Sequence, residues 1–399
     1  MKQLLLISLI VLLYSCSSTN KEQEQIQTYS IIDLSDIKYS NEPLRLSEFI
    51  DSISYIRIDE EPLVPDLFNT GVTVTDDAIY LEEDFIYKYN FKGKFIKSLF
   101  KKGQGPREAI KVTKAAFDLH NNIVAVDNNK GITFRLYSLE GEHIGDTQKN
   151  DSIGLTKTII GYIKGNEIFY YSAFSVPSMG DLTNMDGPYF IYARNPETDS
   201  IIYKQPNYHY NIKATVQNAR IRDAGYPLCY GSTNDMFWWK HQSVDTVYHT
   251  PDFKNVMPWY VLKKNKSFAD YEFCVHRMVL DVPTSELGRK LISAVYPLDN
   301  GLLYMVTTSG DDGGVGFCRK NGKGVLYSQK GFINDIDGHF KTWIPYNFIF
   351  GNGCVKDGYV YTLINASDFF EEGANPPFPD YTEESNPIIV KFKLREYEE

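Results

Sequence analysis

The sequence predicts an all-β chain, folded as a six-bladed β-propeller whose blades are four-stranded antiparallel sheets. Two observations carry this prediction. From about residue 43 to the C-terminus, short runs of β-branched and aromatic residues follow one another, separated by turn residues. A strand–turn–strand phrase that turns at Gly93 also returns 48 residues later at Gly141. This spacing suits a four-stranded blade better than a helical repeat.

The strands can be assigned in order along the chain. The first unit has strands at 79–81 and 86–89 and turns at Gly93, where we expect a positive φ. The second unit repeats this pattern at 123–127 and 134–137. The later groups are weaker, and their strands are expected at 167–170, 236–239 with 246–248, 302–306 with 324–327, and 359–363 with 388–392. Counted together, these groups number six.

Closure of the ring can also be predicted. Residues 54–58 form a strand-like run near the start of the body, and we expect it to pair with 388–392 and so complete the last blade. The only helix-like stretch is 285–293, which is too short to support a helical domain. A pair of β-sandwiches is the alternative fold, because short alternating strands do not by themselves fix closure.

The N-terminus has the features of an export signal. Lys2 precedes an uncharged stretch at 4–13, and Cys16 follows directly after Leu13, Tyr14 and Ser15. This ending resembles the lipobox of bacterial lipoproteins, in which the cysteine is lipidated after cleavage. We therefore predict a signal peptide at 1–15, lipidated Cys16 and a flexible tether at 16–42, and the propeller at 43–399. A plain secretory signal with an incidental cysteine is the alternative.

Several phrases along the body carry a family resemblance. The most specific is 103–108, which reads Gly-Gln-Gly-Pro-Arg-Glu, and further matches lie at 44–53, 245–248, 334–338 and 386–390. Together with the lipobox, they resemble the six-bladed β-propeller lipoproteins of Bacteroidetes, whose blades are similar to those of NHL-repeat propellers. The resemblance implies a propeller and a lipid anchor, and it implies no established reaction.

Composition and motifs narrow the function. The chain carries 41 Lys and Arg against 51 Asp and Glu, a net charge of −10, so nucleic acid is not an expected partner. The seven histidines form no His-Glu-x-x-His pattern, and no Gly-x-Ser-x-Gly elbow is present. No cofactor and no metal are expected. Asn334, Asp335 and Asp337 have the alternating oxygens of a calcium loop, but an Asx-type turn is the favoured interpretation.

Candidate ligand contacts are expected in loops and on aromatic residues. Long Pro- and Gly-rich loops contribute two aromatic residues, and Arg107 departs from the family phrase at a position that usually holds Gly. In the strand 236–239, one of Trp238 and Trp239 should pack between blades while the other is wetter. The candidates are Arg107, Phe174, Trp238, Asp335, Asp337 and Phe378.

The remaining cysteines predict no reactive site. Cys229, Cys274, Cys318 and Cys354 are spaced as if on successive blades, where a cysteine usually serves as a small buried apolar residue. Disulfide bonds between them are the alternative, since an exported protein can form them.

The expected function is a non-catalytic binding or scaffolding propeller, held at the outer membrane by its lipid anchor. Its partner would be a glycan, a peptide or another envelope protein. Ser17 directly after Cys16 resembles the outer-membrane sorting of lipoproteins, whereas the side of the membrane that the body faces stays open. The alternative function is an exported hydrolase or lyase, with acidic residues at the propeller channel.

Overall fold

A computed structural model describes most of the chain from residue 29 onward. The described residues are 29–64, 70–103, 105, 108–109, 112, 114–127, 133–148, 157–171, 189–206, 228–233, 236–241, 244–269, 288–308, 313–323, 325–345, 348–349 and 353–397. The predicted signal peptide at 1–15 and Cys16 lie outside them.

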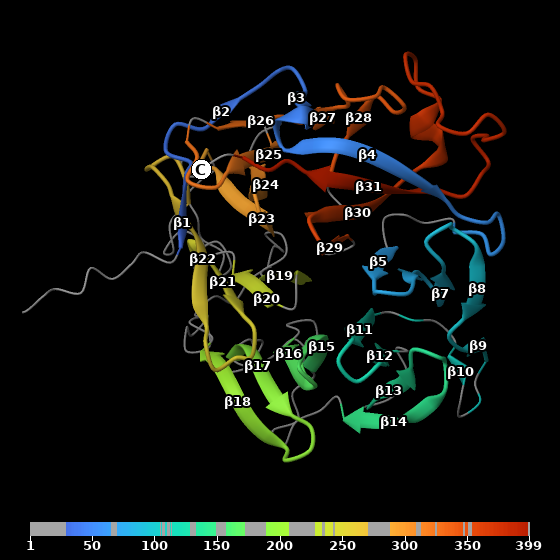
Figure 1. Ribbon diagram of the computed structural model, residues 1–399. Coiled ribbons are helices and arrows are strands. Elements are labelled where there is room, and N and C mark those ends of the chain that lie inside the picture. The colour runs from blue at the N-terminus through green and yellow to red at the C-terminus, as the bar shows by residue number, and fades with distance from the viewer. Residues whose placement is uncertain are drawn as a thin grey trace, which may run out of the picture.

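Five sheets are arranged around a common centre; four of them extend outward from one innermost strand, and the fifth, with nine strands, extends outward in two directions from strands near that centre (Figure 1). Three of them have four antiparallel strands in sequential order, and one has three. Their strands are β5 (Gly71–Val74), β6 (Ile79–Glu82), β7 (Ile86–Tyr89) and β8 (Phe95–Ser98); β11 (Lys114–Asp118), β12 (Ile123–Asp127), β13 (Thr133–Ser138) and β14 (His143–Gln148); β15 (Lys157–Ile163), β16 (Asn166–Tyr171), β17 (Tyr189–Asn195) and β18 (Ser200–Pro206); and β23 (Leu291–Leu298), β24 (Gly301–Thr307) and β25 (Gly314–Arg319). The predicted all-β propeller with four-stranded antiparallel blades is confirmed.

The fifth sheet has nine strands and changes the predicted blade count. In order across the sheet, they are β1 (Ser30–Asp33), β22 (Met257–Lys263), β21 (Thr246–Thr250), β20 (Met236–His241), β19 (Leu228–Thr233), β29 (Cys354–Lys356), β30 (Tyr359–Ile364), β31 (Ile388–Leu394) and β4 (Ile50–Arg57). A parallel pair, Thr233 with Val355, joins β19 to β29 and merges two four-stranded antiparallel groups. Counted as hydrogen-bonded sheets, the blades therefore number five, and the predicted six is wrong.

The ring closes as the sequence predicts. β4, near the start of the body, pairs antiparallel with β31 at its end, with Ile389 opposite Ile56 and Val390 opposite Tyr55. This pairing covers an edge of β31 that would otherwise be exposed, and it connects the two ends of the chain in one sheet. A pair of β-sandwiches does not have this arrangement.

The N-terminal part of the body runs across several sheets, and we call residues 29–57 the strap. Its first strand, β1, pairs parallel with β22, and Ile32 and Leu34 are fully buried there. Further along, β2 (Lys38–Tyr39) pairs with β26 (Leu326–Tyr327), and β3 (Leu44–Arg45) pairs with β27 (Phe332–Ile333), which also pairs with β28 (Thr342–Trp343). The propeller body thus begins before the predicted boundary at residue 43, because apolar strap residues pack into its core.

Helices contribute little to the described part of the chain. Two short 3-10 turns are present, η1 (Leu46–Glu48) and η5 (Ala366–Phe369). Of the helix-like stretch predicted at 285–293, residues 291–293 belong to β23. Among the described residues, no helix has the length and apolar character needed to cross a membrane.

The core is rich in aromatic residues packed between adjacent elements. Phe49 of the strap stacks on Phe317 with ring centroids 4.5 Å apart, and Trp343 contacts Phe392 of the last strand at 4.9 Å. Cys229 and Cys318 are buried and Cys354 is partly buried, and these three described cysteines are free thiols. Burial raises the pKa of the Cys318 thiol to about 12, which makes it unreactive near neutral pH. Cys274 lies outside the described residues.

Two hairpin glycines fix the contact between successive sheets. Gly93 has a φ of +78° and Gly141 a φ of +84°, as the repeated turn predicts. A Cβ atom at Gly93 would lie 1.8 Å from the carbonyl oxygen of Arg57, and one at Gly141 would lie 2.1 Å from that of Leu99. Both turns therefore press against the backbone of the preceding sheet, and only glycine fits there.

We predict that Gly93→Ala lowers the free energy of unfolding by about 3 kcal/mol. About 1 kcal/mol comes from the positive φ and the rest from the clash with Arg57. Gly358→Ala is the matched control, because Gly358 has a φ of +76° and no atom within 4 Å of the added Cβ. Chemical denaturation should give a loss of only about 1 kcal/mol for the control. Equal losses would contradict the close approach.

Candidate functional site

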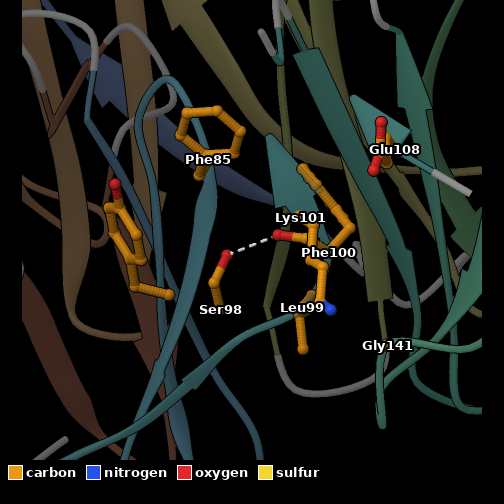
Figure 2. Close-up of a pocket in the computed structure, with 8 residues that line it drawn as sticks. Phe85, Ser98, Leu99, Phe100, Lys101, Glu108 and Gly141 are labelled. Carbon is orange, nitrogen blue, oxygen red and sulfur yellow. Dashed lines mark hydrogen bonds between the residues drawn. The ribbon is translucent and has the colours of Figure 1, made fainter. Parts of the chain in front are cut away.

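A cleft of about 660 Å³ lies beside β7 and β8 and reaches the short strands β9 (Lys101–Lys102) and β10 (Glu108–Ala109) (Figure 2). Its walls come from the loop before β7, from β7 and β8, from the segment after β8, and from the β13–β14 turn. The residues that line it are Phe85, Tyr87, Ser98, Leu99, Phe100, Lys101, Glu108 and Gly141.

The cleft combines aromatic walls with a few polar groups. The ring centroid of Phe85 is 6.4 Å from that of Tyr87 and 6.1 Å from that of Phe100, so the three rings form one aromatic group. The Ser98 hydroxyl donates a hydrogen bond to the Phe100 carbonyl at 2.9 Å, shown as the dashed line in Figure 2. Lys101 and Glu108 add one cation and one carboxylate. Such a surface can stack on a flat apolar group and hydrogen-bond its polar edge.

Glu108, the last residue of the family phrase at 103–108, borders the cleft. The Gly105 amide donates a hydrogen bond to the Glu108 carboxylate at 2.9 Å, and a Cβ atom at Gly103 would lie 1.9 Å from a Glu108 carboxylate oxygen. The Arg135 guanidinium donates to the Gly105 carbonyl at 3.1 Å and also to the Glu108 carbonyl. These contacts connect the segment to the neighbouring sheet and hold Glu108 in place. Arg107 itself lies outside the described residues.

A second polar group comes from β6 and β11, which belong to neighbouring sheets of the ring (Figure 1). Glu82, at the end of β6, accepts a hydrogen bond from the Thr73 hydroxyl at 2.7 Å. Lys114, at the start of β11, places its ammonium nitrogen 4.5 Å from the ring centroid of Tyr230. We call Glu82 and Lys114 the channel pair.

The surroundings of the channel pair shift the pKa values of both groups toward neutral pH. Burial raises the pKa of the Glu82 carboxyl to about 7, although the Thr73 hydrogen bond and the Lys114 charge oppose this shift. Burial lowers the pKa of the Lys114 ammonium to about 8, against the charges of Glu82 and Asp127. Near pH 7 both groups can therefore gain or lose a proton, as groups in binding and catalytic sites often do.

The channel pair could not be found from the sequence. Glu82 and Lys114 are single charged residues at the ends of strands, 32 positions apart, and no motif includes both. The β6 and β11 strands bring them together only because the two sheets are neighbours in the ring. The aromatic cleft was also missed, because its residues come from four separate segments, at 85–87, 98–101, 108 and 141.

Asp335 and Asp337 fasten the strap. The Asp335 carboxylate accepts hydrogen bonds from the Ser47 amide at 2.9 Å and the Ser47 hydroxyl at 2.7 Å, and Asp337 accepts one from the Tyr55 hydroxyl at 2.8 Å. The Asn334 side chain accepts from the Asp337 amide at 3.3 Å, which confirms the Asx-type turn. These carboxylates therefore hold the strap, and the ligand contacts predicted for them stay predictions. Among the described residues, no three His, Cys, Asp or Glu side chains gather as a metal site.

The prediction that one of the two tryptophans would be wetter is wrong, since both are fully buried. The Trp238 ring packs against Tyr296 at 5.1 Å, and Trp239 donates a hydrogen bond to Gln205 at 2.6 Å. Both side chains are buried because neighbouring sheets cover both faces of β20. Trp238 therefore has no surface for a ligand in this structure.

The other predicted contacts lie elsewhere. Phe378, in the loop between β30 and β31, is partly buried, with its ring centroid 6.4 Å from that of Tyr381. It does not line the cleft beside β7 and β8. Phe174 and Cys16 lie outside the described residues, so their predicted roles stay predictions.

Comparisons with known proteins identify relatives by fold. The family model described as "Domain of unknown function (DUF4934)" matches residues 29–393. A protein of Bacteroides fragilis NCTC 9343 described as exported has 12% identity, covers 92% of this chain and 100% of its own, and gives a TM-score of 0.61. A DUF4221 family member from Bacteroides vulgatus has 10% identity, covers 87% and 97%, and gives a TM-score of 0.48. No curated protein matches the sequence. The first likeness shows a shared fold, and its source agrees with the predicted relationship to Bacteroidetes proteins.

We predict that Glu82→Gln changes how stability depends on pH. The folded-state pKa of about 7 lies above the ordinary value of 4.5, so ionising Glu82 costs free energy in the folded protein. The wild-type free energy of unfolding should therefore fall, relative to the variant, by about 1 to 2 kcal/mol between pH 5 and pH 8. Because the pKa of Lys114 is lowered to about 8, its loss of a proton makes the free energy of unfolding rise with pH, and this rise falls mainly above pH 8.

Urea denaturation at the two pH values measures this difference. Glu372→Gln, which removes an exposed carboxylate, is the control and should show no such change. A difference between wild type and Glu82→Gln that is constant with pH would contradict the raised pKa.

Proposed function

Because the chain belongs to the family described as a domain of unknown function, DUF4934, we propose a function from its geometry: it is an exported, lipid-anchored propeller of the outer membrane that binds a glycan. The cleft beside β7 and β8 holds the ligand, and binding involves no chemical reaction.

The aromatic group in the cleft is the observation that carries this proposal. Sugar rings have an apolar face that stacks on aromatic side chains, and the partly exposed rings of Phe85 and Tyr87 line one opening, with the buried ring of Phe100 packed against Phe85. Lys101 and Glu108 can hydrogen-bond the hydroxyl groups at the edge of a sugar. A peptide or an envelope protein could use the same aromatic group, but the single cation and single carboxylate suit an uncharged polar ligand best.

Two observations support export and anchoring. The start of the sequence resembles a lipoprotein signal that ends at Cys16, and the described body begins only 13 residues later. The exported Bacteroides fragilis protein shares the fold over 92% of this chain. Lipid attached at Cys16 would hold the propeller at the membrane through a short tether.

The channel pair favours a second candidate function, that of an exported hydrolase or lyase. A carboxyl with a pKa near 7 and an amine with a pKa near 8 can act as acid and base in one site. In that case Glu82→Gln should abolish cleavage of a polysaccharide substrate while its binding persists. A panel of polysaccharides, assayed for new reducing ends and for unsaturated products, decides between this function and binding alone.

We predict that Tyr87→Ala weakens glycan binding about tenfold, because it removes one stacking surface from the cleft. The ligand is first identified on a glycan array, and calorimetry then measures the affinity of the purified protein. Phe91→Ala is the matched control, since Phe91 is an exposed aromatic residue in the β7–β8 turn and does not line the cleft. If both variants bind like the wild type, the cleft is not the binding site.

A further prediction concerns the anchor. Cys16→Ala should abolish labelling by a fatty-acid probe and remove the protein from the detergent phase of a membrane extract, because Cys16 is the residue placed for lipidation. Cys274→Ala, at a cysteine far from the signal, should leave labelling unchanged. Labelling that persists in the Cys16 variant would refute the anchor.

A further inference from the structure

The strap lies beside a group of exposed lysines, although the chain as a whole is acidic with a net charge of −10. Carboxylates also occur in this region: Asp33 is bound to Lys263, Asp245 is bound to Lys264, and Asp36 and Asp299 lie nearby. We call the group the basic edge, and it consists of Lys38, Lys263, Lys266, Lys320 and Lys323.

The strand pairing of the strap explains why these lysines gather. β1 lies opposite β22, so Asp33 faces Lys263, and their charged groups are 2.8 Å apart. On its other side, the backbone of Asp33 forms an isolated parallel β-bridge with Lys323, and the Asp33 amide donates a hydrogen bond to the Gly322 carbonyl at 3.1 Å. The β25–β26 turn, which also carries Lys320, is thereby held against the strap.

Two further contacts add the remaining lysines. Lys38 lies in β2 opposite Leu326, the first residue of the strand that follows the β25–β26 turn. The Asn265 side chain donates a hydrogen bond to the Ser35 carbonyl, which keeps the neighbouring Lys266 beside the strap. All five lysines are exposed, and the Lys263 side chain is 62% exposed even with its partner.

The basic edge is also where the described body meets the N-terminal segment. The strap starts at Tyr29, and a tether from Cys16 to that point spans at most about 45 Å when fully extended. A lipid anchor at Cys16 would thus keep the basic edge within a short distance of the membrane. Figure 1 places β1 and β22 on the opposite side of the ring from β8 and β9, which border the aromatic cleft.

We infer that the basic edge docks on an anionic membrane surface, so that the propeller rests on its strap side and its aromatic cleft faces away from the lipid. This inference rests on the proposed anchor at Cys16. Lysines near an anionic membrane are attracted to its headgroups, each strengthening binding about fivefold at moderate salt. The anchor also raises the local concentration of the lysines at the membrane surface, so weak individual contacts are enough for docking.

The test uses the full-length protein, purified in detergent from cells that process lipoproteins and reconstituted in vesicles of phosphatidylcholine alone or with about one-third phosphatidylglycerol. Lysine reactivity toward an acetylating reagent is measured residue by residue with mass spectrometry. In the anionic vesicles we expect the acetylation rates of Lys38, Lys266 and Lys323 to fall about fivefold, because the membrane covers them. The rates should recover in 0.5 M salt, at about which concentration the charges are screened within a few ångströms.

Matched variants separate docking from a general charge effect. The triple variant Lys38→Glu, Lys266→Glu and Lys323→Glu should restore full acetylation of Lys320. Lys92→Glu, Lys94→Glu and Lys341→Glu change the net charge equally at exposed positions outside the basic edge, and this control should keep Lys320 protected. Equal melting temperatures would show that both variants are folded.

The outcomes distinguish this inference from the proposed anchor. Protein that does not float with either vesicle refutes the anchor and, with it, docking. Protein that floats but whose basic edge reacts equally in both vesicles refutes docking alone. Protection that appears in whole cells but not in anionic vesicles identifies an envelope protein as the partner and overturns the membrane assignment.

Discussion

The pairing of β4 with β31 is the interaction on which the rest of the structure depends. It joins the beginning of the body to its end, with residue pairs from Ile388 opposite Arg57 to Leu394 opposite Ile50. Without it, β31 and the strap would each expose a row of unpaired backbone groups. Side chains secure it further: Asp335 holds Ser47, Asp337 holds Tyr55, and the Asn386 amide group donates to the carbonyls of Asp59 and Pro62 at 2.7 and 2.9 Å.

Closure also creates the sites. Once the sheets stand in a ring, the ends of strands from neighbouring sheets meet, and Glu82 of one sheet comes near Lys114 of the next. Similarly, the segment after β8 reaches the following sheet and forms the cleft with the loop before β7. The strap that closes the ring places lysines beside the first described residues of the body. The aromatic cleft, the channel pair and the basic edge thus occupy separate regions of one framework.

Features that depend on local sequence were predicted well. The Gly93 and Gly141 turns and the closing strand follow from short patterns, because hairpins and strand runs are specified by nearby residues. Features that depend on which elements pack against a surface were not predicted correctly. Trp238 and Trp239 are both fully buried, because neighbouring sheets pack on both sides of β20. The number of sheets likewise depends on a single residue pair, Thr233 with Val355, which no local pattern predicts.

The sequence by itself determined the all-β class, the antiparallel four-stranded blades, the turn glycines and the strand that closes the ring, because each follows from the period of two along strands and from local turn chemistry. The tertiary structure decided the rest. Which residues share a cleft, which carboxyl and amine interact through their charges, and which aspartates fasten the strap all depend on residues far apart in the chain, such as Ser47 and Asp335. Such contacts exist only after the ring has closed, so no local pattern encodes them.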